Sequence, residues 1–483
     1  MNAGIDFGTS TCSIGVWRDG RPALLALEGD SPRLTSALHS TRQFLSVTPL
    51  DARDLAQRKT AEAKRLRSAK RRSAGATAVV DEQRLDSLVR GTMRREAATA
   101  ETARRRRQSP DAALYADDEI TFGEEAVRQH LLDPHRGYFV KSPKSFLGAD
   151  VKQQHIDLFA EIITRMLAHI KATAEAQTGT PIDSVCLGRP VRFHGLRGEE
   201  GNRQAVAILE RSAVAAGFEH IEFLFEPIAA ALDYERTIER DVIALVLDAG
   251  GGTTDCSMVR IGPSYREMTN RQASVLGYSG DRIGGTDFDV KLAIHKIMPH
   301  FGKDTLLSSG LPVPSPVYWN AVTINDVHAL ADFASEKTGR EIAQLLGHAQ
   351  EKDKVARLLE LHQGRHTYRL NRSAELGKIA LSDRETISLP LQYIEPDFVL
   401  SLSREDLRAA VGRELDKFIR LMQEAQAQAG VAPDVIYVTG GTAKSPMIEE
   451  CLRAHYGDVD IVVGDLFGSV TSGLATWAQR IFR

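Results

Sequence analysis

Residues 4–11, GIDFGTST, are the stretch that decides the fold, and residues 247–254, LDAGGGTT, repeat its pattern. In each, an apolar run ends in an aspartate, Asp6 or Asp248, and a turn rich in Gly and Thr leads into a second apolar run. This order is typical of a β-hairpin with a glycine-rich tip. Because it recurs about 240 residues later, we expect two lobes of similar topology with a cleft between them.

Helical and strand-like segments alternate along the rest of the chain. Apolar residues recur at helical spacing in residues 158–176, 203–216, 227–239 and 404–429. Short apolar runs at 185–188 and 435–438 have the character of buried parallel strands. The alternation predicts an α/β protein. We expect lobe I to comprise residues 1–238 with 466–483, and lobe II residues 239–465.

Two segments depart from this pattern, and we interpret both as insertions. Residues 51–110, in lobe I, carry 17 basic against 8 acidic residues and few aromatics. Residues from about 290 to 368, in lobe II, are helical in pattern around a cluster of prolines. The basic insertion is either a solvated helical extension or a docking arm for an acidic or nucleic-acid partner, or for anionic lipid.

Composition indicates a globular protein. Of 483 residues, 42% are hydrophobic, and the net charge of -3 gives no overall attraction to nucleic acid or membranes. No basic leader followed by an apolar segment precedes the first strand, and no apolar run is long enough to span a bilayer. The four cysteines are scattered without CxxC spacing. We therefore expect a cytoplasmic protein with reduced thiols.

The two hairpins predict a phosphate-binding site. Glycines at the tips allow backbone N–H groups to approach phosphate oxygens, and the hydroxyls of Thr9, Ser10, Thr253 and Thr254 add donors. A carboxylate precedes each tip, where Asp6 and Asp248 can hold the waters of a Mg²⁺ ion. These residues alone therefore predict a site that binds phosphate groups together with Mg²⁺.

Six motifs resemble those of one superfamily. The two hairpins resemble the phosphate-1 and phosphate-2 motifs of the actin/Hsp70/sugar-kinase superfamily. Residues 225–234, FEPIAAALDY, resemble the Hsp70 segment NEPTAAAIAYG, and residues 284–289, GGTDFD, resemble GGEDFD. Residues 438–446, VTGGTAKSP, resemble the adenosine motif VGGSTRIP, and residues 375–382, ELGKIALS, resemble ERAKRTLS. The chain is most similar to Hsp70 proteins, in particular the YegD-type chaperones that lack the substrate-binding domain.

The resemblance implies an actin-like ATPase fold of the ribonuclease H-like kind, with two lobes around a nucleotide cleft. It implies ATP or ADP with Mg²⁺ as cofactors, K⁺ as a further candidate ion, and a protein client of unknown identity. The implied metal-site residues are Asp6, Glu226, Asp248 and Asp255. The implied catalytic residues are Asp248, which would orient the attacking water, Lys144, Thr253 and Glu226, with Lys141 as the alternative to Lys144. The implied nucleotide-binding residues are Gly8, Thr9, Ser10, Thr11, Gly250, Gly251, Gly252, Thr253, Gly284, Gly285, Thr286, Glu375, Lys378, Ser382, Gly440, Gly441, Thr442 and Lys444.

Three positions depart from the family pattern. Ile379 and Lys444 stand where the family has the two arginines that enclose adenine, and Phe467 stands where it has an aspartate. Because Lys has no planar group to stack as Arg does, we expect weaker adenine binding and looser base selectivity.

The sequence leaves several functions open. The motifs favour a slow ATPase with a chaperone-like or assembly role. A small-molecule kinase and an ATP-sensing scaffold with little turnover remain alternatives, and an actin-like filament is the least favoured of the four.

Overall fold

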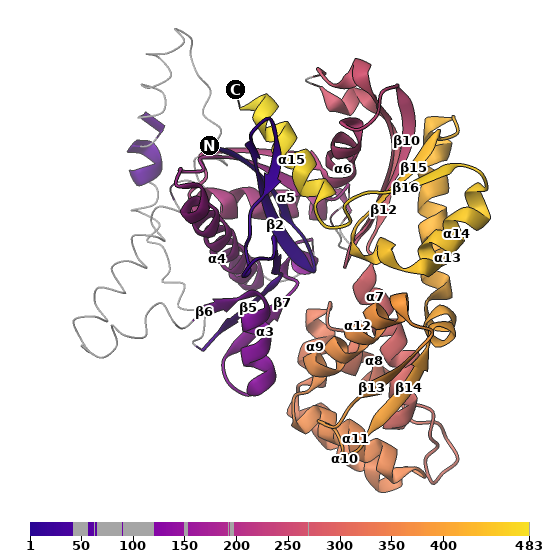
Figure 1. Cartoon of the computed structure of the whole chain (residues 1–483). Helices are drawn as coiled ribbons and strands as arrows, with labels where there is room; N and C mark the ends of the chain where they lie inside the picture. The colour runs from indigo at the N-terminus through magenta and orange to yellow at the C-terminus, as the bar shows by residue number, and fades with distance from the viewer. Residues whose placement is uncertain are drawn as a thin grey trace.

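The computed structural model describes residues 1–41, 57–61, 63, 64, 89, 120–148, 153–191, 193, 198–268 and 270–482. Two large sheets dominate it (Figure 1). The first contains β1 (Asn2–Phe7), β2 (Thr11–Arg18), β3 (Arg21–Leu24), β4 (Arg33–Thr35), β8 (Ser184–Arg189) and β9 (His220–Phe225). The second contains β10 (Val242–Ala249), β11 (Thr254–Ile261), β12 (Val275–Asp281), β15 (Val435–Thr439) and β16 (Asp460–Val463).

Both sheets have one strand pattern. The orders are β3-β2-β1-β8-β9 and β12-β11-β10-β15-β16. In each, the first three strands are antiparallel and the last two run parallel to the third. The glycine hairpins are β1–β2 and β10–β11, so each turn leaves the central strand of its sheet. This places Asp6 and Asp248 at equivalent positions, where ligands gather in open α/β sheets.

Helices cover both sheets. They are α4 (Gln153–Thr178), α5 (Glu199–Ala216), α6 (Glu226–Glu235), α13 (Arg404–Ala429), α14 (Pro446–Tyr456) and α15 (Ser469–Ile481). The longest in the second half, α13, begins with a capping box between Ser403 and Asp406 and ends at Gly430 in a left-handed conformation. The expected helix at 227–239 is shorter than predicted, because α6 ends at Glu235.

Smaller units extend from each sheet. A three-stranded sheet, β6-β5-β7, contains β5 (Ala37–Ser40), β6 (Ile120–Phe122) and β7 (Tyr138–Lys141), and α3 (Gly123–Leu132) packs on it. Next to the second sheet lie α7 (Gly285–Leu292), α8 (Pro316–Val322), α9 (Val327–Phe333), α10 (Glu336–His348), α11 (Lys352–Gln363), α12 (Thr367–Asp383) and the hairpin of β13 (Thr386–Pro390) and β14 (Val399–Ser403). The segment from 290 to 368 is thus helical. The basic insertion lies outside the described residues, apart from 57–61, 63, 64 and 89.

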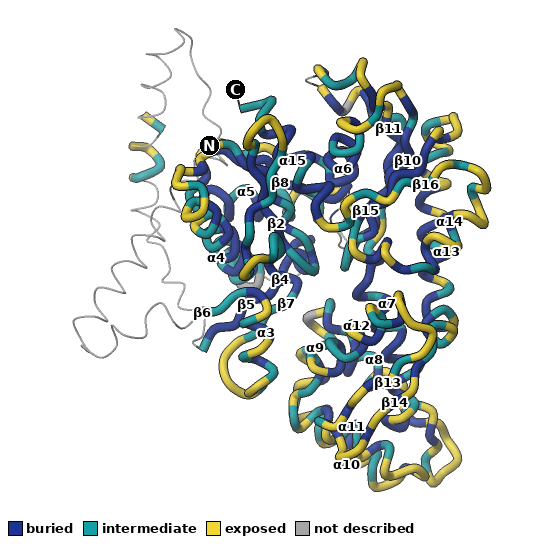
Figure 2. Tube along the Cα trace, in the orientation of Figure 1, coloured by how far each residue is buried: buried dark blue, intermediate teal, exposed yellow. Residues whose placement is uncertain are grey.

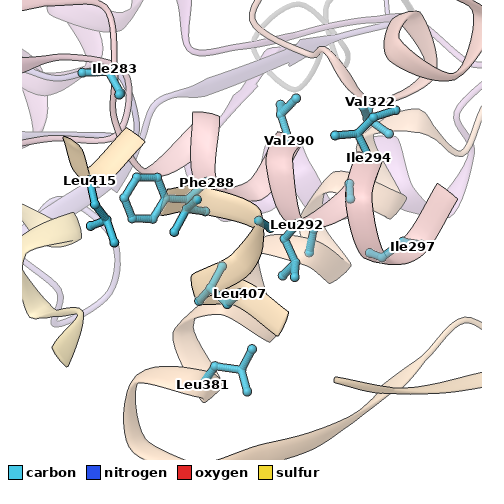
Figure 3. Close-up of a cluster of buried hydrophobic side chains, with 14 of the residues drawn as sticks. Ile283, Phe288, Val290, Leu292, Ile294, Ile297, Val322, Leu381, Leu407 and Leu415 are labelled. Atoms are coloured by element: carbon cyan, nitrogen blue, oxygen red, sulfur yellow. The ribbon is translucent and has the colours of Figure 1, made fainter. Parts of the chain in front are cut away.

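The buried core follows the strands and the central helices, whereas the outer faces of α10 and α11 are exposed (Figure 2). One cluster anchors α7, where Phe288 and Leu292 pack with Leu381 of α12 and Leu407 and Leu415 of α13 (Figure 3). The N-terminus of α7 is thereby fixed beside the β10–β11 turn. Among the described residues, no helix combines the length and apolarity needed to cross a membrane.

The contact between α6 and α15 joins the two large sheets and provides a test of the fold. A Cβ atom on Gly473 of α15 would lie 1.8 Å from the carbonyl oxygen of Ala229 in α6. We therefore expect Gly473→Ala to lower the free energy of unfolding by about 1–3 kcal/mol. Gly412→Ala is the matched control, because Gly412 is also helical and has open space around it, and it should stabilise the protein by up to about 1 kcal/mol. Equal urea midpoints for wild type and Gly473→Ala would contradict this packing.

Candidate functional site

A cavity of about 710 Å³ is lined by residues from both glycine hairpins, α12 and the loop before α15. Most of the predicted site residues line it: Asp6, Gly8, Thr9, Ser10, Thr11, Lys144, Glu226, Asp248, Gly250, Gly251, Thr253, Gly285, Thr286, Glu375, Lys378, Ser382, Gly440, Gly441, Thr442 and Lys444. Gly252, Gly284 and Asp255 are not among the lining residues. The structure therefore brings residues more than 400 positions apart in the chain to one cavity, as Asp6 and Lys444 show.

The tips of the two hairpins touch. A Cβ atom on Gly251 would lie 1.8 Å from the hydroxyl oxygen of Ser10, and one on Gly252 would lie 2.6 Å from the Cγ2 of Thr9. Neither glycine tolerates a side chain without moving the opposite hairpin. Gly252 thus has a packing role in this structure, and its neighbours Gly251 and Thr253 face the cavity.

Lys144 lies in a buried acidic group. It belongs to the short helix η2 (Pro143–Phe146), which begins after Ser142 in a left-handed conformation, with φ of 59°. The Lys144 Nζ donates to Glu226 Oε1 at 2.6 Å, and both side chains are less than a tenth exposed. Glu226 is the first residue of α6, where the helix dipole favours a carboxylate. Burial alone would lower the pKa of Lys144, but the charges of Glu226 and Asp6 outweigh it and raise the pKa.

The carboxylates around Lys144 outnumber it. Burial, with repulsion from Glu226, raises the pKa of Asp6 to about 7. Burial, with repulsion from Glu226, Asp6 and Asp255, raises the pKa of Asp248 well above its usual range. Asp255 lies directly opposite Asp248 in the β10–β11 ladder, and its Oδ1 accepts the N–H of Val191 at 2.8 Å. Additional positive charge in the cavity would stabilise this group.

The same group fits a hydrated magnesium ion better than a directly ligated one. Among the described residues, no three His, Cys, Asp or Glu side chains converge closely enough to hold a metal ion by themselves. Mg²⁺ commonly retains several waters and binds few carboxylates. Three of these carboxylates line the cavity and are suited to hold such an ion through its waters: Asp6, Glu226 and Asp248. Asp255 does not line the cavity and contributes its negative charge next to Asp248.

Several predicted phosphate-binding groups also hold the turns together. The N–H groups of Gly285 and Thr286 donate to the carbonyls of Gly250 and Gly251 at 3.0 and 2.7 Å. The hydroxyl of Thr442 donates to the carbonyl of Gly250 at 2.8 Å. These three donors are satisfied within the protein, so their part in the site is to fix the β10–β11 turn. Gly284, the N-cap of α7, packs against the backbone of the same turn.

Ion pairs connect α12 with the small sheet and α3 across the cavity. Lys141 of β7 donates to Glu375 at 3.1 Å, and Arg372 pairs with Glu124 of α3 at 3.3 Å and with Glu375 at 3.0 Å. Burial would raise the pKa of Glu375, but Lys141 and Arg372 outweigh it and hold that pKa at about 2. Lys378 on the next turn pairs with Asp289 at 2.8 Å. Glu375 and Lys378, two of the predicted nucleotide-binding residues, are thus held in place by ion pairs.

Sequence reasoning missed several lining residues. Arg372 lies three residues before Glu375 on one face of α12, and this spacing of opposite charges is visible in the sequence. Asp289 closes the GGTDFD motif. Nothing in the sequence pointed to Arg33, whose guanidinium carbon lies 4.1 Å from the ring centre of Phe467. Arg33 and Phe467 both line the cavity.

One family model matches the chain. The model is described as Hsp70 protein, and it matches residues 140–308. The matched segment contains Lys144, Glu226, the β10–β11 hairpin and α7. The match supports the Hsp70 family and, with it, the actin-like ATPase superfamily, and the mixed α/β architecture is consistent with that fold. Members of the Hsp70 family generally bind ATP or ADP with Mg²⁺, hydrolyse ATP and bind client proteins.

Proposed function

We propose that this chain binds ATP with Mg²⁺ between two lobes and hydrolyses it slowly, with closure of the lobes coupled to a chaperone-like or assembly role. The observation that carries the proposal is the buried Lys144–Glu226 pair set among Asp6, Asp248 and Asp255, beside two glycine turns that meet tip to tip. A structural ion pair alone needs neither the additional carboxylates nor the cavity. This excess of buried negative charge is suited to a metal–phosphate ligand.

In the proposed reaction, water attacks the γ-phosphate in line with the leaving oxygen. Asp248, at the end of a rigid central strand, orients that water. The ammonium of Lys144 stabilises the charge that develops on the transferring group, and the hydroxyl of Thr253 contacts the γ-phosphate. Mg²⁺, held through its waters by Asp6, Glu226 and Asp248, would neutralise part of the phosphate charge when bound.

The cross-cavity ion pairs support the coupling to closure. Lys141 with Glu375 and Arg372 with Glu124 join elements on opposite sides of the cavity. The first pair is largely shielded from solvent. The second is more exposed, so it contributes only modestly to holding this arrangement. Opening the cavity for nucleotide exchange would have to break both.

The kinase alternative has less support in this geometry. Such an enzyme needs a carboxylate free to take a proton from the acceptor hydroxyl. Glu28 and Glu124, which line the cavity away from Lys144, are both occupied: Glu28 accepts the N–H groups of Thr35 and Glu124, and Glu124 pairs with Arg372. We therefore favour ATP hydrolysis over phosphoryl transfer to a second substrate as the activity of this site.

Titration calorimetry and single-turnover hydrolysis of γ-labelled ATP test the proposal. We expect ATP binding that strengthens with Mg²⁺, and slow release of labelled inorganic phosphate. The same titrations in the presence of a chelator are the control, because the buried carboxylates repel the phosphates when no cation is present. No ATP binding under either condition would contradict the proposal. Tight binding without phosphate release would replace it with the ATP-sensing scaffold.

A further inference from the structure

One end of the cavity differs in chemistry from the phosphate-binding end. At this end α12 and η7 (Gly441–Lys444) come together at Gly285. A Cβ atom on Gly285 would lie 3.0 Å from Nζ of Lys378 in α12 and 2.7 Å from Oγ1 of Thr442 in η7. Ile379, next to Lys378, and Phe467, which packs on η7, bound this end. Both are large apolar side chains and both are substantially exposed, Ile379 by 50% and Phe467 by 39%. Exposed apolar surface inside a cavity favours an uncharged, planar part of a ligand.

The ring of Phe467 is held in a defined position. Its backbone N–H donates to Asp465 Oδ1 at 3.2 Å, and the preceding carbonyl, of Leu466, accepts the N–H of Gly440 at 3.1 Å. A Cβ atom on Gly441 would lie 2.8 Å from the ring of Phe467, so the glycine makes room for the aromatic side chain. Phe288, the other aromatic residue that lines the cavity, is fully buried in the core. Phe467 therefore offers an accessible, preorganised aromatic surface.

Arg33 supports this ring. Its guanidinium lies over Phe467, and within the described part of the chain no carboxylate pairs with it. The local turn fixes the Arg33 backbone, whose N–H donates to the Ser31 hydroxyl at 3.1 Å. An arginine that stacks on a ring without a carboxylate partner stabilises the ring by cation–π attraction.

We propose that Phe467, backed by Arg33, is the stacking surface for the purine base of the bound nucleotide, with Ile379 as the apolar cover. The inference rests on the proposed binding of ATP and identifies what selects its base. In this chain the aromatic ring of Phe467 contacts the base. It takes the place of a planar guanidinium group, which neither Ile379 nor Lys444 has. Purines are preferred over pyrimidines because their larger ring system covers more of Phe467.

The test compares a nucleotide with a ligand that has no base. Affinities for MgATP, MgCTP and magnesium tripolyphosphate are measured by calorimetry for wild type, Phe467→Ala, Phe467→Trp and Arg33→Ala. We expect Phe467→Ala to weaken ATP binding about tenfold. Phe467→Trp should retain ATP affinity, and the preference of wild type for ATP over CTP should disappear in Phe467→Ala. Tripolyphosphate affinity should be equal in all four proteins. Arg33→Ala should weaken ATP binding by about threefold through loss of support for the ring.

The outcomes separate this inference from the proposed function. Wild-type binding of ATP that is unchanged in Phe467→Ala overturns the stacking surface and leaves the proposed function intact. An equal loss of ATP and tripolyphosphate affinity in Arg33→Ala also overturns it, because Arg33 would then be a phosphate contact. Absence of ATP binding by the wild type overturns both.

Discussion

We expect Asp248→Asn to lower the single-turnover rate of ATP hydrolysis by about 10²- to 10⁴-fold and to leave ATP bound. The amide keeps the shape of the carboxylate but is a weaker acceptor for the attacking water. Burial, with repulsion from Glu226, Asp6 and Asp255, raises the pKa of the Asp248 carboxylate. The neutral amide of the variant avoids both penalties. The variant should therefore unfold no earlier than wild type when no metal is present, so that any loss of rate is a loss of chemistry.

Asp281→Asn is the matched control for this substitution. Asp281 belongs to the same sheet, at the end of β12, but its side chain is exposed and does not line the cavity. We expect wild-type hydrolysis from this variant. An Asp248→Asn protein that still hydrolyses ATP at the wild-type rate would remove Asp248 from the mechanism and leave the positioning of water to another residue.

The strands and the hairpins were predictable because their signals are local. Asp6 and Asp248 each follow a run of apolar residues and precede glycines, and such a pattern has few structural alternatives. The parallel strands at 185–188 and 435–438 were predictable for the same reason, and β8 and β15 do pair in parallel with β1 and β10. The end of α6 was not predictable. Residues 236–239 continue the helical pattern of the sequence, but the helix ends at Glu235.

Contacts between distant segments explain what the sequence could not predict. Arg33 meets Phe467 across more than 400 residues, and neither residue has a motif that identifies the other. The same holds for Lys141 and Glu375, each of which was predicted to lie at the site, whereas their ion pair was not. Motifs identified many of the residues that line the cavity. The pairing of charges across the cavity depends on how the sheets are placed, which only the folded structure shows.

We expect Lys144→Ala to lower the rate of hydrolysis by about 10²- to 10³-fold, because it removes the ammonium proposed to stabilise charge on the transferring phosphoryl group. It also leaves Glu226 buried without its 2.6 Å partner, beside Asp6. Removal of one partner of a buried ion pair costs about 3–5 kcal/mol of folding free energy. Urea unfolding should show this loss, and Mg²⁺ with ATP should recover part of it by restoring positive charge among the carboxylates.

Two further variants separate the roles of Lys144. Glu226→Gln combined with Lys144→Ala should regain stability, because the unpaired carboxylate is gone, but it should not regain hydrolysis. Lys141→Ala should retain hydrolysis, because Lys141 pairs with Glu375 at the opposite wall and not with the carboxylates around Asp248. Loss of hydrolysis in Lys141→Ala with retention in Lys144→Ala would reverse the assignment and give the charge-stabilising role to Lys141. Lys144 would then be a structural counterion, and the excess of buried carboxylate would need another explanation.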